Sequence, residues 1–460
     1  MGTLIGIDLG TSSFKAAAFD LGGAQRGVVS RPTPWREGPN GAELAPDVFA
    51  HAVKELVEDC AQRFAPGDVL AVGVTGMAET SFLETDRGEL LPARAWNHRG
   101  ERALPGLQAF ARTGLVDPAR TPLVELRAAA DDGVAIRAWH GLPDHAVRVL
   151  GGRRMLERSL ATRTGLVDVR AGTWDPALME WAGVADAEIA DLEPAGTAAG
   201  RVNAGRCREA VLTVAGHDHV TAAVGADASS SDAIFDSLGT GEAIIAELSR
   251  RAVDLEPGTL RRITSKGINV GLGVDESNVV LFAGLGTGNR FNLLLNELEA
   301  LGFDRESVLD PDEAPDSDAC ARARRALPGE AAELLDRLFG PQWQDLRNGE
   351  ATRLVRAAVS SREAARTLWW AAVECSAVRG RTTLREIHRF IPGATRLVSA
   401  GGWLGNSGIR ATRERILGPY TVPGVQQAGA RGAALLAGLA AELYPTRGDF
   451  PRLTSIQEKA

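Results

Sequence analysis

The sequence predicts an α/β protein with two domains and a cleft between them. The chain has 460 residues, and a chain of this length usually divides into two or three domains, because single cores stop growing earlier. Strand-like and helix-like patterns alternate along it, and a Leu-Gly-Thr turn stands between two strand-like runs at 9–11 and again at 238–240, whereas a third copy at 285–287 precedes a helix-like run. The first two copies lie roughly half the chain apart, which favours an internal duplication. We therefore expect domains at 1–228 and 229–460, divided near the polar stretch DASSSD.

The first domain begins with a pattern of strand, turn and strand. TLIGID at 3–8 and FKAAAF at 14–19 are short apolar runs on either side of a turn, and GGAQRGVVS leads into a third extended segment. At 46–64, apolar residues recur with helical spacing after Pro46 and Asp47. VLAVGVTG at 69–76 is typical of a buried strand. The first 76 residues therefore predict the order β-β-β-α-β.

The second half of the chain repeats this alternation. The predicted elements there are strand-turn-strand at 233–248, strand, Gly-rich turn and helix at 278–302, a long helix at 362–387, strand, Gly-rich turn and helix at 394–418, and a helix of small residues at 426–444. The region 98–200 is less regular and rich in Pro and Asp turns. We expect it to form insertions on the first domain.

Composition and charge exclude several classes of protein. The net charge is −8, which argues against a general nucleic-acid binder with a basic face. The four cysteines lie far apart and form no CxxC motif, so neither a zinc site nor a disulfide framework is indicated. No apolar stretch reaches the roughly 18–20 residues of a membrane span, and the start does not read as a signal peptide. We therefore expect a cytoplasmic protein that binds neither nucleic acid nor membrane.

The two Leu-Gly-Thr turns are candidates for phosphate binding. Glycine and threonine in a tight turn present backbone N–H groups and hydroxyls at one point, and such turns bind phosphate. Either turn alone is more simply a β-hairpin, whereas the pair favours a cleft that holds successive phosphates of one nucleotide. The candidate residues are Gly10, Thr11 and Ser12 in the first turn and Gly239, Thr240 and Gly241 in the second.

A different nucleotide motif is present only in part. The sequence VVLFAGLGTGN at 279–289 imitates a dinucleotide fingerprint, but Asn289 stands where GxGxxG needs glycine. A nicotinamide-dependent oxidoreductase is therefore a weaker alternative. Contact with phosphate or adenosine at the start of the following helix stays open, as does close packing alone. A P-loop, GxxxxGK[ST], is absent from the sequence.

The stretch VLTVAGHDH at 211–219 carries the candidate catalytic group. An apolar strand runs into His217, Asp218 and His219, and a carboxylate at the end of a buried strand is well placed to act as a general base. If the strand continued, both histidines would face one way and Asp218 the other. A metal site formed by the two histidines would then lack a third ligand. A second alternative is structural: the two histidines would only form hydrogen bonds to the backbone. We prefer Asp218 as the base.

Two polar patches precede this strand and suit a polyhydroxylated ligand. Vicinal hydroxyls need paired donors and acceptors, and the C–H face of a sugar packs on tryptophan. A solvated loop with one buried tryptophan is the alternative explanation. The candidate residues are Glu79 and Thr80 in GVTGMAETSF, and Trp96, Asn97, His98 and Arg99 in PARAWNHRGER, together with His219.

In order and spacing, these motifs resemble the FGGY carbohydrate kinases. The resemblance runs from Gly6 to about Tyr444: GIDLGTSSFKAAAFD is similar to the first phosphate loop of the family, SLGTGEA to the second, GHDHVTAAVGA to the segment with the catalytic aspartate, and SAGGWLGNSGIRATRERILG to the adenosine-binding segment. It implies two actin-like (ribonuclease H-like) domains that close on ATP from opposite sides. The two Leu-Gly-Thr turns would then be the phosphate hairpins of the two domains.

The resemblance also implies roles for individual residues. Asp8 would hold Mg²⁺ through water, and Asp218 would be the general base. Glu79, Trp96 and Asn97 would meet the sugar together with Asp218. The residues that the resemblance places around ATP are Thr11, Ser12, Lys15, Gly239, Thr240, Gly241, Gly284, Gly286, Gly402 and Asn406.

The implied reaction is transfer of the ATP γ-phosphoryl to a hydroxyl of a ketose or linear polyol. The chain departs from the family in two places. At position 78 it has Ala, where glycerol kinases carry Arg, and this difference disfavours glycerol as the substrate. The segment around 305–350 is also shorter than is usual in the family. The alternatives are an actin-like ATP-driven switch and a degenerate kinase that binds sugar without turnover. The expected binding partner is the small-molecule substrate, and formation of a homodimer is left open.

Overall fold

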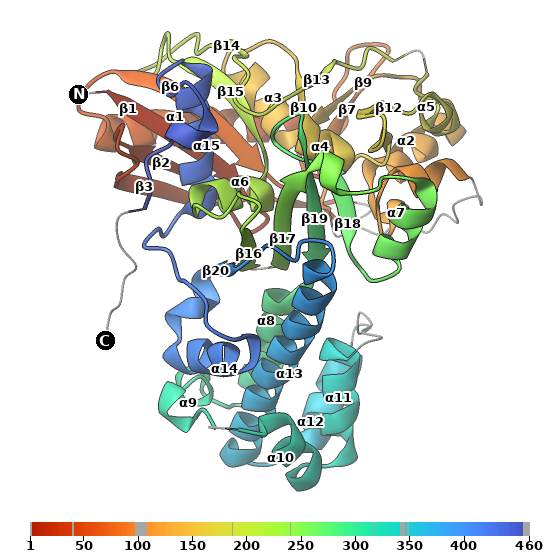
Figure 1. Ribbon diagram of the computed structural model, residues 1–460, viewed down its shortest axis with the longest axis vertical. Coiled ribbons are helices and arrows are strands. Elements are labelled where there is room, and N and C mark those ends of the chain that lie inside the picture. The colour runs from red at the N-terminus through yellow and green to blue at the C-terminus, as the bar shows by residue number, and fades with distance from the viewer. Residues whose placement is uncertain are drawn as a thin grey trace. The chain divides into compact units, whose positions relative to one another are not determined.

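The structure is a computed structural model, which describes residues 2–38, 41–96, 108–185, 187–239, 241–315, 317–340, 346 and 349–453 (Figure 1). Its contacts divide the chain into two compact units. Unit 1 comprises Met1–Ser231, Ile245–Phe282 and Pro423–Ala460, and unit 2 comprises Asp232–Ile244 and Ala283–Val422. The chain first enters unit 2 close to the predicted boundary at 228–229. The functional division at that boundary stays a prediction.

A six-stranded sheet forms the centre of unit 1 in the described part of the chain. Its order is β14-β15-β6-β1-β2-β3. Strand β1 is antiparallel to β2 and parallel to β6, which is parallel to β15. The strands are almost wholly apolar and buried at the centre, as the runs of Val, Ile and Ala predict. Their bounds are β1 (Thr3–Leu9), β2 (Ser13–Phe19), β3 (Gln25–Pro32), β6 (Val69–Gly76), β14 (Gly200–Arg201) and β15 (Val211–His217).

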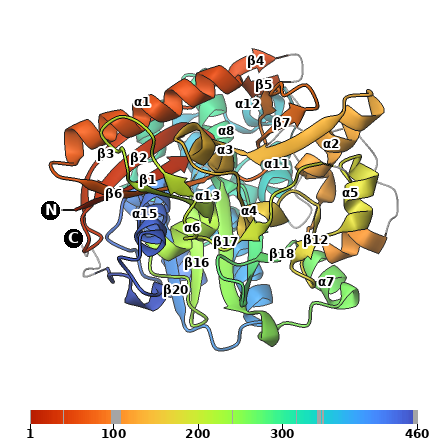
Figure 2. The ribbon, with the colours of Figure 1, turned by 90° about the horizontal axis from the view of Figure 1, so that it is seen from above.

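Helices cover both faces of this sheet. Helix α1 (Pro46–Phe64) packs on β2 and β3, and α15 (Ala428–Ala440) packs on β1, β6 and β15; Figure 2 shows the sheet between them. Glycines allow α15 to approach the backbone directly. A Cβ atom at Gly6 would lie 1.7 Å from the carbonyl oxygen of Ala430, and one at Gly432 would lie 2.0 Å from that of Thr221. The predicted helix of small residues is therefore a close-packing helix.

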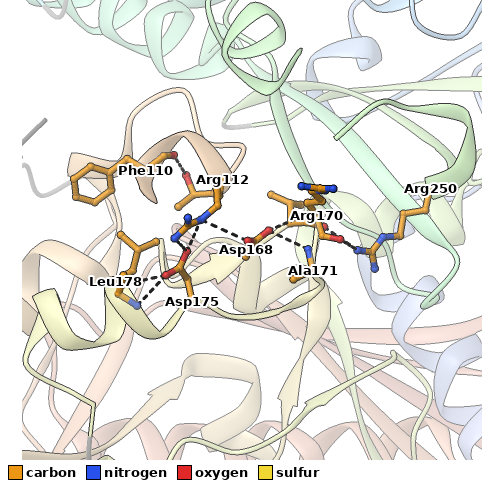
Figure 3. A network of polar contacts seen from close by, with 11 residues as sticks. Phe110, Arg112, Asp168, Arg170, Ala171, Asp175, Leu178 and Arg250 are labelled. Carbon is orange, nitrogen blue, oxygen red and sulfur yellow. Dashed lines mark hydrogen bonds and ion pairs between the residues drawn. The ribbon is translucent and has the colours of Figure 1, made fainter. Parts of the chain in front are cut away.

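The insertions of unit 1 consist of short elements joined by polar contacts. Figure 3 shows Arg112 paired with Asp175, and Arg250 donating hydrogen bonds to the backbone carbonyls of Val169, at 3.0 Å, and Arg170. These contacts fasten the turn after β11 to the segment after β17. The further elements are β4 (Arg36–Gly38), β5 (Gly41–Leu44), β7 (Ser81–Thr85), β8 (Ala93–Arg94), η1 (Gln108–Arg112), η2 (Pro118–Arg120), α2 (Pro122–Asp131), β9 (Ile136–Gly141), α3 (Leu142–Val149), β10 (Leu156–Glu157), α4 (Arg158–Thr162), β11 (Val167–Asp168), β12 (Thr173–Trp174), α5 (Pro176–Ala182), β13 (Leu192–Glu193), α6 (Asp218–Gly225), η3 (Arg250–Ala252), α7 (Pro257–Thr264), β18 (Asn269–Leu272) and η6 (Arg447–Asp449).

Unit 2 is mainly helical around a pair of parallel strands, β16 and β20. Its core contains an aromatic cluster in which the ring of Phe291 lies 5.0 Å from Trp369 and 5.2 Å from Trp403. Strands β17 and β19 carry the chain from one unit to the other. The elements are β16 (Ala233–Leu238), β17 (Glu242–Ser249), β19 (Asn278–Gly284), α8 (Thr287–Ala300), α9 (Arg305–Val308), η4 (Pro311–Glu313), α10 (Ala319–Ala326), α11 (Gly329–Phe339), α12 (Glu350–Ala358), α13 (Arg362–His388), β20 (Arg396–Ala400), η5 (Gly402–Gly405) and α14 (Ser407–Leu417).

Candidate active site

The first predicted phosphate loop joins β1 to β2 and is fixed by three side chains. Thr33 Oγ1 donates to the carbonyl of Gly10, and Trp35 Nε1 donates to the carbonyl of Thr11, both at 2.7 Å. Trp96 Nε1 donates to Thr11 Oγ1 at 2.7 Å. A residue predicted for the sugar therefore touches a residue predicted for phosphate. Ser12, at the tip of the turn, is exposed.

Asp8 lies on β1, directly opposite Lys15 on β2. Burial and, second, the negative charge of Asp218 raise the pKa of the Asp8 carboxyl to about 7, although the positive charge of Lys15 acts to lower it. Two carboxylates that repel each other in this way favour a cation between them. Gly429 leaves room beside this carboxylate, since a Cβ atom there would lie 2.7 Å from Asp8 Oδ2.

The donor set around Asp8 fits magnesium better than a transition metal. Mg²⁺ is usually held by one or two carboxylates together with water and substrate phosphates, and Asp8 with Asp218 offers that set. Within the ranges that the structure describes, no three His, Cys, Asp or Glu side chains are grouped as metal ligands. A metal site at 217–219, the alternative considered for this segment, therefore lacks a third ligand among the described residues.

Asp218 is the first residue of α6, immediately after β15 ends at His217. The expectation that both histidines face one way by strand alternation is wrong, because β15 ends at His217, and Asp218 and His219 belong to α6. Gly216, one residue before the end of the strand, has a φ of +110°. The two histidine rings still lie 5.6 Å apart, edge to face. Asp218 Oδ1 accepts the N–H of His219 at 2.7 Å and lies 3.2 Å from His217 Nε2.

The surroundings of Asp218 keep its carboxylate ionised. Burial acts to raise its pKa, but His219, His217, the His219 N–H group and Arg163 together lower the pKa below its usual value. Burial lowers the pKa of His217 to about 4, so that imidazole is neutral at neutral pH. Asp218 is therefore available as a proton acceptor, as a general base requires.

Glu79 is held by an arginine that the sequence patterns do not single out. Arg163, just after α4, donates from Nε to Glu79 Oε1 at 2.7 Å, and its guanidinium lies 5.3 Å from the ring centre of Phe282. The Phe282 ring lies 5.3 Å from that of His217 and 5.7 Å from that of His219. The structure thus joins the GMAET patch to the GHDH segment. The Arg in ATRT and the Phe in VLFAG carry no motif that marks them in advance.

Two buried polar atoms beside this group have no hydrogen-bond partner among the described residues. They are Arg163 Nη1 and Thr80 Oγ1. Buried polar groups are nearly always paired, and each exception needs an explanation. A hydroxylated ligand would supply the missing partners.

In unit 2, the second predicted phosphate loop and the GLGTG loop are joined by Glu242. The backbone N–H groups of Leu285 and Gly286 point to the carbonyl of Glu242 at 2.7 and 3.4 Å, and the carboxylate of Glu242 accepts a hydrogen bond from Thr287. The N–H group of Gly239 donates to the carbonyl of Gly241 at 3.2 Å, which closes the turn. Gly284 ends β19 and Gly286 precedes α8. The predicted nucleotide residues of this unit thus belong to adjoining loops.

Comparisons with known proteins concern the fold of the chain. No protein-family model matches the chain. The curated glycerol kinase of Trichlorobacter lovleyi is 25% identical over 100% of this chain and 94% of that protein, and the gluconokinase of Bacillus subtilis is 22% identical over 42% of this chain and 40% of that protein. The solved structure of ligand-bound xylulose kinase from Lactobacillus acidophilus has a TM-score of 0.78 at 18% identity and covers 100% of this chain and 93% of that one. Gluconate kinase from the same organism has a TM-score of 0.77 at 17% identity, covering 99% and 93%.

The chain has the fold of the FGGY carbohydrate kinases. The predicted resemblance and the predicted class, two actin-like α/β domains, are confirmed. The relatives are phosphotransferases that act on carbohydrates and polyols, and one of the similar solved structures, glycerol kinase from Plasmodium falciparum, contains ADP. Along the described part of the chain, each helix is too short or too polar to span a lipid bilayer.

The structure describes the positions of most of the predicted site residues. Glu79, Asp218 and His219 are brought together, and Trp96 joins Thr11. Thr80 is fully buried. Gly402 begins a short 3₁₀ turn, and Asn406 caps α14, its Oδ1 accepting the N–H of Ile409 at 3.1 Å. Four residues lie outside the described residues: Asn97, His98, Arg99 and Thr240.

A buried ion network of unit 2 was also not indicated by the sequence. Arg413 Nη2 donates to Asp236 Oδ2 at 2.7 Å and to Glu242 Oε1 at 2.6 Å, and all three side chains are 1% exposed or less. Ser399 donates a further hydrogen bond to Asp236 at 2.8 Å. The network fixes Glu242 and with it the two loops that Glu242 joins.

Proposed function

We propose that this protein is an ATP-dependent kinase that transfers the γ-phosphoryl group to a hydroxyl of a ketose or linear polyol. The observation that carries the proposal is the ionised carboxylate of Asp218 beside the Glu79–Arg163 pair, in a chain with the FGGY kinase fold. A proton acceptor next to donors and acceptors for hydroxyls is what such a transfer needs.

Asp218 would take the proton of the attacking hydroxyl. Its lowered pKa makes it a weak base, so its role would be to orient the hydroxyl and accept the proton late in the step. Asp8 would hold Mg²⁺, with Asp218 as the second carboxylate nearby. Magnesium bound there offsets the negative charge of the phosphate oxygens. Lys15, opposite Asp8, would add a second positive charge toward the phosphates.

The proposed nucleotide contacts belong to glycine-rich loops. In unit 1 these are Gly10, Thr11 and Ser12, whose backbone is fixed by Thr33 and Trp35. The proposed contacts of unit 2 are Gly239, Thr240, Gly241, Gly284, Gly286, Gly402 and Asn406. The side-chain amide of Asn406 already bonds to Ile409 and Leu309, so we expect it to shape the adenosine site and not to recognise the base directly.

The sugar would contact Glu79, Thr80, Trp96 and Arg163. The buried Thr80 Oγ1 and Arg163 Nη1, which lack partners among the described residues, support a ligand with several hydroxyls. Asn97, His98, Arg99 and His219 stay predicted contacts. The relatives include glycerol, gluconate and xylulose kinases, and Ala78 disfavours glycerol. A cytoplasmic location and a homodimer also stay predictions.

The test is ADP release, measured by a coupled assay with ATP and Mg²⁺ across a panel of ketoses, aldonates and polyols. Turnover that depends on one or a few panel members is the expected result and identifies the substrate class. ADP release that is equal with and without every sugar would support the ATP-driven switch. Sugar binding by calorimetry without any ADP release would support the degenerate kinase. The oxidoreductase alternative loses its basis because the fold is that of sugar kinases.

A further inference from the structure

The four cysteines of the chain form two pairs with different surroundings. Cys60 and Cys207 are buried in the core of unit 1, close enough for one thiol to influence the other. Cys320 and Cys375 lie in unit 2, are partly exposed, and share a side-chain hydrogen bond. All four are free thiols. The chain therefore holds two dithiols, and their chemistry can be compared directly.

The second pair is brought together by the packing of α10 on α13. Glu374 on α13 accepts the backbone N–H of Ala319 at 3.0 Å and that of Cys320 at 3.3 Å. Because Cys375 follows Glu374 directly, this carboxylate holds the start of α10 next to Cys375. Arg415 Nη2 donates a further hydrogen bond to Glu374 Oε2 at 3.1 Å. Cys320 is thereby held beside the turn of α13 that carries Cys375, although the two residues are far apart in sequence.

The charges around this pair favour one thiolate and one thiol. The hydrogen bond from Cys375 and a second one from Arg324, one helical turn after Cys320, lower the pKa of Cys320 to about 6, against burial and the charge of Glu374. The same hydrogen bond raises the pKa of Cys375. Arg324 is itself held by Asp336. A partly exposed thiolate beside an arginine and a second thiol has the features of a reactive cysteine.

The first pair has the opposite environment. Cys60 is fully buried and Cys207 is 2% exposed. Burial raises the pKa of each thiol to about 12, so both stay protonated, and a buried protonated thiol is inert. Cys60 and Cys207 are therefore an internal control for reactivity.

We propose that Cys320 and Cys375 form a reversible redox-sensitive dithiol that responds to hydrogen peroxide. The Cys320 thiolate attacks one peroxide oxygen, the O–O bond breaks, hydroxide leaves, and Cys320 becomes a sulfenic acid. The Cys375 thiol then attacks that sulfur, the S–S bond forms, the S–O bond breaks, and water leaves. In total, two thiols lose two electrons and two protons, and peroxide is reduced to two waters. A small thiol such as glutathione reverses the step and is itself oxidised to its disulfide.

The test is peptide mass spectrometry of the full chain, exposed briefly to hydrogen peroxide at neutral pH in its folded state, after which the remaining free thiols are alkylated in denaturant. We expect one cross-linked peptide that joins Cys320 to Cys375 with the loss of two hydrogens, released by dithiothreitol, while Cys60 and Cys207 are alkylated. Cys375→Ser should leave Cys320 as a sulfenic acid that dimedone traps. Cys320→Ser should abolish both products.

A matched pair of arginine variants tests the origin of the reactivity. Arg324→Gln should slow oxidation of Cys320 about tenfold, because less of it is thiolate at neutral pH, whereas substitution of its exposed neighbour, Arg325→Gln, should leave the rate unchanged. Separate alkylation of Cys320 and Cys375 after peroxide would overturn the proposal. Cross-linking of Cys60 to Cys207 at the same rate would also overturn it, since oxidation would then be unselective.

Discussion

Arg163 Nε donates a hydrogen bond to Glu79 Oε1 at 2.7 Å, and Arg163 Nη2 approaches the same oxygen at 2.5 Å. The two side chains are 18% and 13% exposed, so neither charge is fully solvated. Residues 84 positions apart are thereby joined, and the polar patch at 79–80 is positioned beside the segment that carries Asp218.

Replacement of Arg163 should affect both stability and sugar binding. Arg163→Met leaves the Glu79 carboxylate partly buried without its partner, which should lower the free energy of unfolding by about 1–3 kcal/mol. The KM for the sugar should rise about tenfold with a smaller change in kcat, because the binding group loses its orientation. Steady-state kinetics and urea denaturation measure the two effects. The exposed pair of Arg153 and Glu193 provides the control, since Arg153→Met should change neither quantity. An unchanged KM in Arg163→Met would remove Glu79 from the sugar site.

Loss of the proposed base should reduce turnover far more than nucleotide binding. Asp218→Asn keeps the shape of the side chain but cannot accept a proton, so kcat should fall about 10²–10⁴-fold. The thermal shift produced by ATP with Mg²⁺ should change little, because Asp8 and both candidate phosphate loops are intact. Asp227→Asn, at an ion pair with Arg452 at 2.6 Å, is a control with full expected activity. A kcat near that of the wild type would show that another group accepts the proton.

The raised pKa of Asp8 makes stability depend on pH in a defined direction. The pKa of the Asp8 carboxyl is near its ordinary value of 3.8 in the unfolded chain and is raised to about 7 in the folded protein. Between these pH values the folded state binds more protons, so its stability falls as the pH rises. Asp8→Asn removes this dependence. The difference in the free energy of unfolding, Asp8→Asn minus wild type, should be smallest near pH 4. It should increase up to about pH 7, as the wild type loses stability, and then stay constant. Urea denaturation without nucleotide or metal measures it, and a flat difference across that range would contradict the shifted pKa.

Close packing of α15 predicts a large difference between two substitutions of glycine by alanine in helices. A Cβ atom at Gly432 would lie 2.0 Å from a backbone oxygen, whereas nothing lies within 4 Å of one at Gly258 on α7. Gly432→Ala should lower the free energy of unfolding by about 1–3 kcal/mol or more, since backbone must move. Gly258→Ala should be neutral or raise it by about 0.4–1 kcal/mol. Thermal unfolding followed by circular dichroism compares them, and equal midpoints would show that α15 is not packed this closely.

The buried ion network of unit 2 should be sensitive to the loss of its arginine. Arg413→Met leaves Asp236 and Glu242 without their shared partner and should cost about 3–5 kcal/mol of unfolding free energy. A second substitution, Asp236→Asn, should restore part of this loss, because one unpaired charge is removed. The surface pair of Arg389 and Glu386, with Arg389 66% exposed, supplies the comparison: Arg389→Met should cost about 0–1 kcal/mol. Chemical denaturation provides the values, and a further loss in the double variant would contradict the network.

Local patterns predicted much of the fold. The helix at 46–64 has the predicted bounds, Pro46–Phe64, and the strand at 69–76 is β6, because periodicity and buried runs are encoded within each segment. The strands β4 and β5 before α1 were not predicted, since each has at most four residues. The alternation rule failed at 217–219, because β15 ends at His217 and α6 begins at Asp218.

Local patterns could not predict which distant segments of the chain contact one another. Arg163 and Arg413 carry no motif, and their roles arise only when the fold brings Glu79 to one and Asp236 to the other. In the same way, nothing within 423–460 indicates that it packs with Met1–Ser231. Motif order identified the candidate loops and the base, while the residues that hold them in place became visible only in three dimensions.

The position of α15 has a consequence for biosynthesis. The strands β1 and β6 are among the first segments to leave the ribosome, whereas Ala428–Ala440, which covers one face of them, is among the last. Until translation is nearly complete, α15 cannot cover that apolar face, and we expect the exposed face to favour aggregation of the nascent chain. All of unit 2 is synthesised in the interval. A premature stop codon before residue 428 should therefore yield an insoluble product even though both candidate phosphate loops and Asp218 are present in it.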